Sequence, residues 1–211
     1  NNDIYIITGY KYSNSVRILK SSDNGNTWTE IKMLNYKNIT SICSDSEKLY
    51  VGTWGRGVLC TSDNGDTWYN WSVGLKNLYI TKLLKVGNYI YAGTIKDFHF
   101  SSDNGYSWVK SNEGMLPLSV NHLSTLNENI IATTKDGFSI SFSSDNGTTW
   151  NDISRGIDDI DINYIAVVKN FILTGNGYRR NLTDSIWTKV SDNIFKVHIV
   201  LDTIIISYGS G

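Results

Sequence analysis

Side chains able to perform acid–base, nucleophilic or metal chemistry are few and scattered along this chain. The three histidines, His99, His122 and His198, lack the spacing of metal ligands. Ser-His-Asp and Cys-His nucleophile signatures and phosphate-binding glycine loops are not evident. The sequence therefore predicts no catalytic residues, no metal site and no cofactor.

Aromatic and basic side chains, by contrast, gather in short segments that recur along the chain. Aromatic rings stack on a ligand and guanidinium groups donate paired hydrogen bonds, so together they suit a sugar or an acidic peptide. The alternative is that each is an ordinary turn residue of a protein rich in Tyr and Lys. The candidate ligand-binding residues are Tyr10, Tyr12, Trp54, Arg56, Phe98, His99, Tyr178 and Arg179.

An octapeptide that recurs four times must set the frame that positions these segments. Its first copy, Ser21–Trp28, reads Ser-Ser-Asp-Asn-Gly-Asn-Thr-Trp, and the aspartates recur about every 40 residues. A worn fifth copy ends at Trp187. Such a step indicates one supersecondary unit used repeatedly. The shared structural positions are Asp23, Gly25 and Trp28; Asp63, Gly65 and Trp68; Asp103, Gly105 and Trp108; Asp145, Gly147 and Trp150.

Each octapeptide is typical of a tight turn between two strands. Its Asp can accept hydrogen bonds from backbone N–H groups one or two residues on, and Asn-Gly tolerates positive φ. The Trp is expected to pack beneath the turn against the next unit, because it is too large to leave exposed. Calcium binding by the aspartates is the weaker alternative, since each turn brings only one carboxylate.

The octapeptide resembles the Asp-box (BNR) repeat, Ser/Thr-x-Asp-x-Gly-x-Thr-Trp, and the resemblance spans about 190 of the 211 residues. Proteins with this repeat include sialidases, sortilin-type receptors, xyloglucanase-type glycosidases and photosystem II assembly factors. All are β-propellers with the box between the third and fourth strands of a blade. The resemblance implies fold rather than function, because enzymes and non-enzymes share the box.

Short runs of alternating apolar residues bounded by turn residues give four strands per repeat. The predicted fold is all-β, a β-propeller of about five four-stranded antiparallel blades in one domain over 1–211. The chain opens at a second strand and ends with a first and a second strand. Either the C-terminal first strand completes the N-terminal blade, which we favour, or the chain is a piece of a larger ring. The predicted repeats are 1–37, 38–78, 79–118, 119–160 and 161–192, with 193–211 closing the ring.

The two ends of such blades differ in what they carry. The Asp-boxes and the first-to-second turns lie at one end, and the second-to-third turns and the links between blades lie at the other. In the resembled family the second end carries the ligand, and the candidate residues named above fall there. We call this end the loop face.

Composition indicates which kinds of partner and which cellular compartment suit the protein. The net charge is −1, which argues against a sequence-independent grip on nucleic acid or on an anionic membrane. No apolar run approaches the ~20 residues of a membrane span. Cys43 and Cys60 are expected on the first and third strands of one blade, too far apart for a disulfide, so free thiols are predicted. The location stays open, with an extracellular or periplasmic one favoured, and the oligomeric state is not indicated.

The predicted function is a non-catalytic binding module that recognises a glycan through the loop face. A protein-binding or assembly-factor propeller is the alternative. A fragment of a sialidase or xyloglucanase-type hydrolase is a second alternative. The chain has only five arginines and no Arg-Ile-Pro motif before its first box, which argues against a sialidase. Xyloglucanase-type enzymes use two facing propellers, and no carboxylate pair stands out here.

Overall fold

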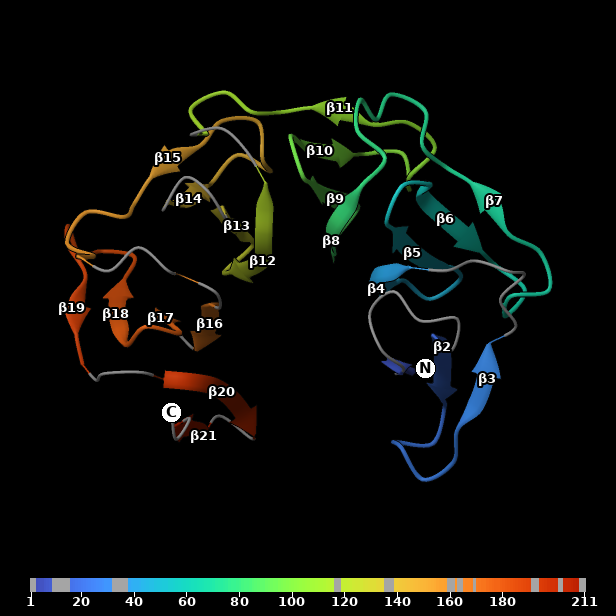
Figure 1. Cartoon of the computed structure of the whole chain (residues 1–211), viewed down its shortest axis with the longest axis horizontal. Helices are drawn as coiled ribbons and strands as arrows, with labels where there is room; N and C mark the ends of the chain where they lie inside the picture. The colour runs from blue at the N-terminus through green and yellow to red at the C-terminus, as the bar shows by residue number, and fades with distance from the viewer. Residues whose placement is uncertain are drawn as a thin grey trace. The chain divides into compact units, whose positions relative to one another are not determined.

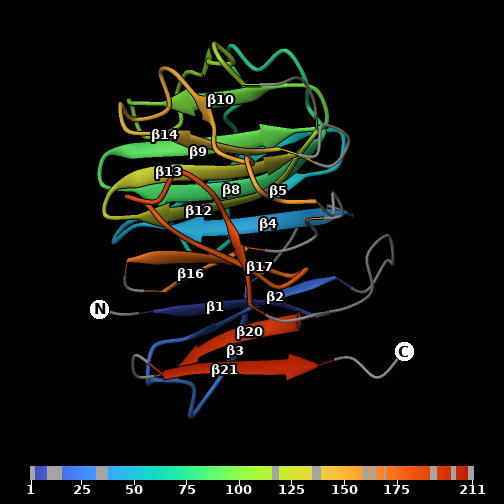
Figure 2. The ribbon, with the colours of Figure 1, turned by 90° about the vertical axis from the view of Figure 1, so that its left-hand side faces the viewer.

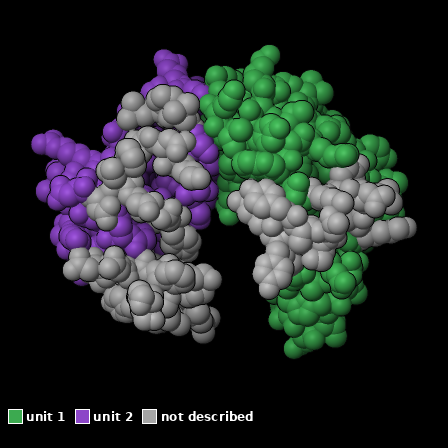
Figure 3. Space-filling view, in the orientation of Figure 1, with its two compact units in different colours: residues 1–110 green, residues 111–211 purple. Residues whose placement is uncertain are grey.

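The computed structural model describes residues 3–8, 16–31, 38–115, 119–134, 139–158, 162, 165–168, 170–190, 194–200 and 203–208. Within these ranges, the side chains of residues 168 and 194–208 are not described. The chain forms two compact units, residues 1–110 and 111–211, shown in different colours in Figure 3. The boundary falls inside the predicted repeat 79–118, directly after its fourth strand. The single domain over 1–211 and the closing of a ring by 193–211 stay predictions.

The first unit contains three antiparallel sheets, labelled in Figure 1. We number the four octapeptide copies box 1 to box 4 in chain order. Box 1 joins β2 to β3, box 2 joins β6 to β7 and box 3 joins β10 to β11, so each box precedes the last strand of its sheet. The strands are β1 (Ile4–Thr8), β2 (Arg17–Ser21) and β3 (Thr29–Ile31); β4 (Ile39–Ser44), β5 (Leu49–Thr53), β6 (Gly57–Thr61) and β7 (Tyr69–Asn70); β8 (Ile80–Val86), β9 (Tyr89–Thr94), β10 (Phe98–Ser101) and β11 (Val109–Lys110).

The second unit continues the pattern with two four-stranded sheets and one two-stranded sheet. Strand β20 pairs with β21, and the pair has the order of a first and a second strand, as the sequence predicted. The strands are β12 (Val120–Leu126), β13 (Asn129–Thr134), β14 (Ile140–Ser143) and β15 (Asn151–Asp152); β16 (Ile165–Val168), β17 (Phe171–Thr174), β18 (Tyr178–Asn181) and β19 (Thr188–Lys189); β20 (Ile194–Val200) and β21 (Thr203–Tyr208).

Apolar side chains from neighbouring sheets form the core within each unit. In the first unit, Ile18 and Val51 belong to the cluster between the first two sheets, and Tyr50 and Ile80 to the next. The first strands β4 and β8 lie side by side. Figure 2 shows both strands from the side. Alternation of apolar residues along short strands produces these faces, because successive side chains point to opposite sides of a sheet.

The box turns are closed by their own side chains, in the same way in all four copies. In box 1, Ser21 Oγ donates to Asp23 Oδ1 (2.8 Å) and accepts from the N–H of Gly25 (2.8 Å). Asp23 also accepts from the backbone N–H and the hydroxyl of Thr27. The bonded amide is thus four residues on, not one or two as predicted, because the turn is longer than a two-residue hairpin. Hydrogen bonds led by the Thr27 hydroxyl lower the pKa of Asp23 to about 2. Asn24 and Gly25 have positive φ, as predicted.

The tryptophans of boxes 3 and 4 and of the worn fifth copy bond to the link that precedes their own sheet, whereas contact with the next repeat was predicted. The indole N–H of Trp108 donates to the carbonyl of Trp71 (2.8 Å), and its backbone N–H donates to the carbonyl of Val73 (2.8 Å). Trp150 bonds Ser111 and Glu113 in the same way, and Trp187 bonds Ile153 and Arg155. The prediction of burial holds for these three rings, which are 3–4% exposed.

A glycine lies beneath each of these three tryptophans. A Cβ on Gly74 would collide with the Trp108 carbonyl, and one on Gly114 would collide with that of Trp150. Gly156 approaches the backbone of Trp187 in the same way. Each glycine is the sixth residue after the preceding box tryptophan, which is a second sequence signal beside the box. The link that contains each glycine therefore lies directly against the backbone of the following box tryptophan.

Trp28 departs from the prediction of buried box tryptophans. Its side chain is 38% exposed, and its indole N–H donates to Gly25 within its own turn (3.0 Å). Trp68 is half-buried and packs against the core between the first two sheets.

The two cysteines are free thiols, as predicted. Cys43 on β4 and Cys60 on β6 both lie opposite Tyr50 of the intervening strand β5. Burial raises the pKa of each thiol to about 12, so neither is a reactive thiolate at neutral pH.

We predict that Gly74→Ala lowers the free energy of unfolding by about 2–4 kcal/mol, because the added methyl group meets backbone at φ +94° and cannot be accommodated by a side-chain shift. Gly87→Ala is the matched control, since Gly87 also has positive φ but has open space around its Cα. It should cost about 1 kcal/mol. Urea unfolding monitored by Trp fluorescence measures both variants, and equal losses would contradict the close approach of the link to the Trp108 backbone.

Candidate functional site

The loop face of the first unit is built on the turn between β5 and β6, which contains Trp54 and Arg56. The N–H groups of Gly55 and Gly57 both donate to the carbonyl of Leu78 in the link to the next sheet (3.1 and 2.9 Å). The N–H of Arg56 donates to the hydroxyl of Thr53 (3.1 Å). Backbone bonds thus fix the turn against the link and leave the Arg56 side chain exposed.

Trp54 and Tyr79 form the aromatic centre of this surface. Their rings pack edge to face with centroids 5.3 Å apart, and their backbones form an antiparallel bridge. The Tyr79 carbonyl accepts the N–H of Ile95 from the β9–β10 turn (3.2 Å), so two turns hold Tyr79 in place. Tyr79 is 42% exposed and Leu78 is 40% exposed. We call Trp54, Arg56, Leu78, Tyr79 and the exposed Lys96 the Trp54–Tyr79 surface.

A recurring threonine, which was not among the predicted structural residues, supports the turns of the loop face. Thr53 Oγ1 donates to the carbonyl of Gly57 (2.8 Å), and Thr94 Oγ1 donates to that of Asp97 (2.9 Å). Thr174 plays the same part for Tyr178 by accepting its N–H (2.9 Å). All three are fully buried. The signal was available, because Thr ends the second strand of successive repeats at a nearly constant step.

Phe98 and His99 were predicted to contact ligand, and in the structure neither side chain is exposed at the loop face. Both are fully buried on β10, because Thr94 closes its turn at Asp97 and the strand begins directly after it. Phe98 stacks on Tyr91 (5.9 Å). His99 lies opposite Ala92, in the core between the second and third sheets, and its Nε2 accepts the N–H of Lys76 (3.5 Å).

The remaining candidates divide between exposed, buried and undescribed positions. Tyr178 was predicted to contact ligand, but it is 3% exposed and belongs to the core of the second unit, so its side chain is not exposed at the loop face. Arg179 is exposed, with its guanidinium 4.5 Å above the Phe171 ring. Tyr10 and Tyr12 lie outside the described residues. The neighbouring Arg180 donates to the carbonyl of Ile153 and is half-buried, which indicates a structural role.

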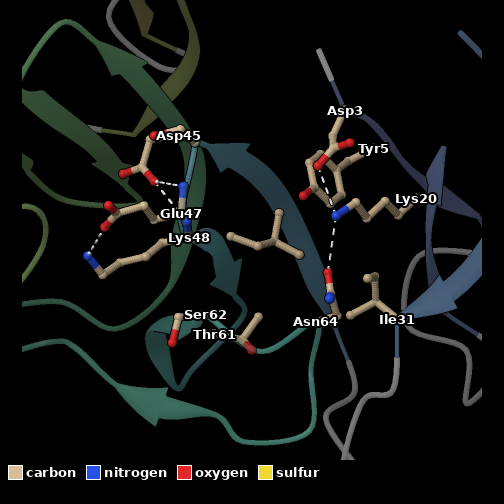
Figure 4. A pocket seen from close by; sticks show the side chains of 12 residues that line it. Asp3, Tyr5, Lys20, Ile31, Asp45, Glu47, Lys48, Thr61, Ser62 and Asn64 are labelled. Carbon is tan, nitrogen blue, oxygen red and sulfur yellow. Dashed lines mark hydrogen bonds and ion pairs between the residues drawn. The ribbon is translucent and has the colours of Figure 1, made fainter. Parts of the chain in front are cut away.

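A small polar pocket of about 50 Å³ lies at the opposite end of the first two sheets, beside box 2 and the β4–β5 turn. Figure 4 shows Lys20 pointing between Asp3 and Asn64, to which it lies 2.8 and 3.1 Å away. The hydrogen bond from Lys20 lowers the pKa of Asp3. Across the pocket, Asp45 accepts the N–H groups of Glu47 and Lys48. The Lys20 ammonium and the carboxylates of Asp3 and Asp45 therefore already have partners within the protein. This pocket was not predicted from the sequence.

Within the described part of the chain, no group of three or more His, Cys, Asp and Glu side chains is placed to hold a metal ion. The same residues include no helix with the length and apolar character of a membrane span. The arrangement at the loop face offers ring stacking, a guanidinium and an ammonium group, all of which can contact a ligand.

Comparison with known proteins supports the fold. No family model and no curated protein matches the sequence. Among solved structures, YCF48 bound to D1 peptide matches with TM-score 0.67 at 13% identity, over 90% of this chain and 67% of that one. The computationally designed Ika8 protein matches with TM-score 0.67 at 10% identity, over 95% and 66%. An ancestral GH74 enzyme matches with TM-score 0.61 at 16% identity, over 74% and 24%.

These likenesses show the fold alone, because the identities are low. The chain is an all-β protein of the β-propeller class, and its complete sheets are four-stranded and antiparallel, as the sequence predicted. The chain spans about two thirds or less of the solved chains that it resembles.

The buried His99 predicts an acid-sensitive native state. Burial lowers its pKa from 6.5 to about 4; Asp97 opposes this shift, and Lys110 and Lys76 reinforce it. As the pH falls through 6.5 towards 4, the unfolded chain gains a proton that the native state does not accept, so native stability falls. His99→Leu, which copies Leu59 at the equivalent position, should remove about 2 kcal/mol of the stability loss between pH 7.5 and pH 5.0.

Urea unfolding at the two pH values tests this prediction. Ser141→Ala is the control, because Ser141 holds the equivalent buried position in the β12–β15 sheet and has no titratable group. The control should keep the pH dependence of the natural chain. An unchanged pH dependence in His99→Leu would show that His99 is protonated without cost in the native state.

Proposed function

We propose that this protein is a non-catalytic binding module that recognises a glycan through the Trp54–Tyr79 surface. The observation that carries the proposal is the edge-to-face pair of Trp54 and Tyr79, held by backbone hydrogen bonds and partly exposed at the loop face. Rigid aromatic rings lose little conformational entropy on binding, and their apolar faces match the C–H faces of sugars. Arg56 and Lys96 supply donors beside them.

The second candidate is a protein or peptide ligand at the same surface. It is favoured by the similar fold of YCF48, which was solved with a D1 peptide, and by the exposed Arg56. A guanidinium pairs with carboxylates through two parallel hydrogen bonds, so an acidic segment is the expected peptide class.

We predict that Trp54→Ala weakens glycan binding at least tenfold, because it removes half of the aromatic pair and its stacking area. The measurement is a glycan array at physiological salt, followed by titration calorimetry on the best ligand. Tyr69→Ala is the control: Tyr69 is 56% exposed on β7, outside the Trp54–Tyr79 surface, and its loss should leave affinity within twofold.

Three results would contradict the proposal in different ways. Absence of binding to any glycan on a broad array would contradict a glycan ligand. Equal losses of glycan affinity in Trp54→Ala and Tyr69→Ala would show that the ligand does not bind at the Trp54–Tyr79 surface. Hydrolysis of a fluorogenic glycoside would contradict the proposal that the module is non-catalytic. Capture of an acidic peptide that Arg56→Glu abolishes, without glycan binding, would establish the second candidate instead.

A further inference from the structure

Five Asn-Gly pairs occur in this chain, one in each of the four boxes and one in the turn between β17 and β18. Asn-Gly is the dipeptide in which asparagine loses its side-chain amide most readily, because glycine has no side chain to hinder attack by its backbone nitrogen. Burial does not protect the box asparagines, since all four are exposed to solvent. They are Asn24, Asn64, Asn104 and Asn146.

Deamidation of such a pair needs no reagent except water. In box 3, the backbone nitrogen of Gly105 gives up its proton and forms a bond to Cγ of Asn104, and the side-chain amide leaves as ammonia. Water then opens either carbonyl of the cyclic imide, which leaves aspartate or isoaspartate at position 104. Both products carry a new negative charge, and isoaspartate also lengthens the backbone by a methylene group.

The glycine N–H that must lose its proton is held in every box by the hydroxyl of the first box residue. In box 3, the N–H of Gly105 donates to Ser101 Oγ (2.8 Å), and Ser101 Oγ donates its own proton to Asp103 Oδ1 (2.7 Å). Because the carboxylate takes the hydroxyl proton, Ser101 Oγ presents lone pairs to the amide. In boxes 1, 2 and 4 the glycine N–H lies 2.8, 2.9 and 2.9 Å from the hydroxyls of Ser21, Thr61 and Ser143.

Burial of the hydroxyl and of the glycine makes this proton hard to remove. Ser101 and Gly105 are both buried, and a Cβ at Gly105 would lie 3.2 Å from Trp71 and 3.3 Å from Tyr50, so side chains of the preceding sheet pack against the turn. Loss of the proton would leave a negatively charged nitrogen facing the lone pairs of Ser101 Oγ, away from water, which is costly. The asparagine is therefore open to solvent while its attacking nitrogen is not.

We propose that the box asparagines are latent deamidation sites, and that the first hydroxyl of each box keeps them unreacted by holding the glycine amide proton. The hydroxyl thus has a chemical role in addition to closing the turn. The reaction proceeds only when the turn opens locally and releases the amide. In box 3, isoaspartate would displace Gly105 from Trp71 and Tyr50 and weaken the packing between the β4–β7 and β8–β11 sheets. This proposal is independent of the glycan proposal.

Incubation of the full chain at mildly alkaline pH, followed by peptide mapping with mass spectrometry, measures each asparagine separately. Ser101→Ala should speed the conversion of Asn104 at least about fivefold, because loss of the hydrogen bond makes the amide easier to release. Ser101→Thr should restore the natural rate, since Thr61 makes the same bond in box 2. Asn146 and Asn176 are internal references, and their rates should not change in either variant.

Ser107→Ala is the matched control, because it removes a hydroxyl from the same turn and leaves the Gly105 amide bonded. Ser107 Oγ donates to Asp103 Oδ2 (2.6 Å), so its loss loosens the turn without freeing the attacking nitrogen. The rate at Asn104 should stay within about twofold of the natural rate. An unchanged rate in Ser101→Ala, or equal acceleration in both variants, overturns the proposal. Conversion of the box asparagines as fast in the folded chain as in urea also overturns it.

Discussion

Contact between the box tryptophan and the link that precedes its own sheet is the constraint on which the rest of each unit depends. The indole N–H and the backbone N–H of one residue donate to two carbonyls of that link, and a glycine in the link lets the two backbones meet. Buried donors that find fixed acceptors define one spacing and one register, whereas apolar packing alone tolerates several. The sheets are thereby held rigidly, and the turns of the loop face, at their other end, are held in fixed positions as a result.

The box turns and the loop-face turns, at the two ends of each sheet, differ in how their side chains use their hydrogen-bonding groups. At the box end, Ser, Asp, Gly and Thr satisfy one another's hydrogen bonds in each copy, which leaves little polar capacity for a ligand. At the loop face, the buried threonine closes the turn with its single hydroxyl. The side chains at the tip of the turn are then free to differ between repeats without cost to the fold.

The sequence was sufficient for the elements of the fold and insufficient for the direction of single side chains. Alternating apolar runs predicted four short antiparallel strands in each repeat, and the complete sheets have four, because short strands between turn residues leave little freedom. Phe98 and His99 were assigned to the loop face although both belong to strand β10, which begins at Phe98. Their side chains point to opposite faces of the sheet, and both faces are covered there, so both residues are buried. The partner of each tryptophan was also misassigned, since a repeated motif does not say whether it packs forwards or backwards.

Differences between the repeats, rather than their likeness, distinguish the surface at which we propose that a ligand binds. A ligand site needs a particular set of side chains, and a position that is the same in every copy cannot distinguish one sheet from another. The turns of the loop face change from Trp54-Gly55-Arg56 in one sheet to Ile95-Lys96-Asp97 in the next, while their threonine and its hydrogen bonds persist. Only in the first of these turns does an aromatic ring meet a second exposed ring from the link, within the described residues of the first unit. The repeated sheets therefore present a similarly supported turn at the loop face, and the pair of Trp54 and Tyr79 makes one of these turns chemically distinct.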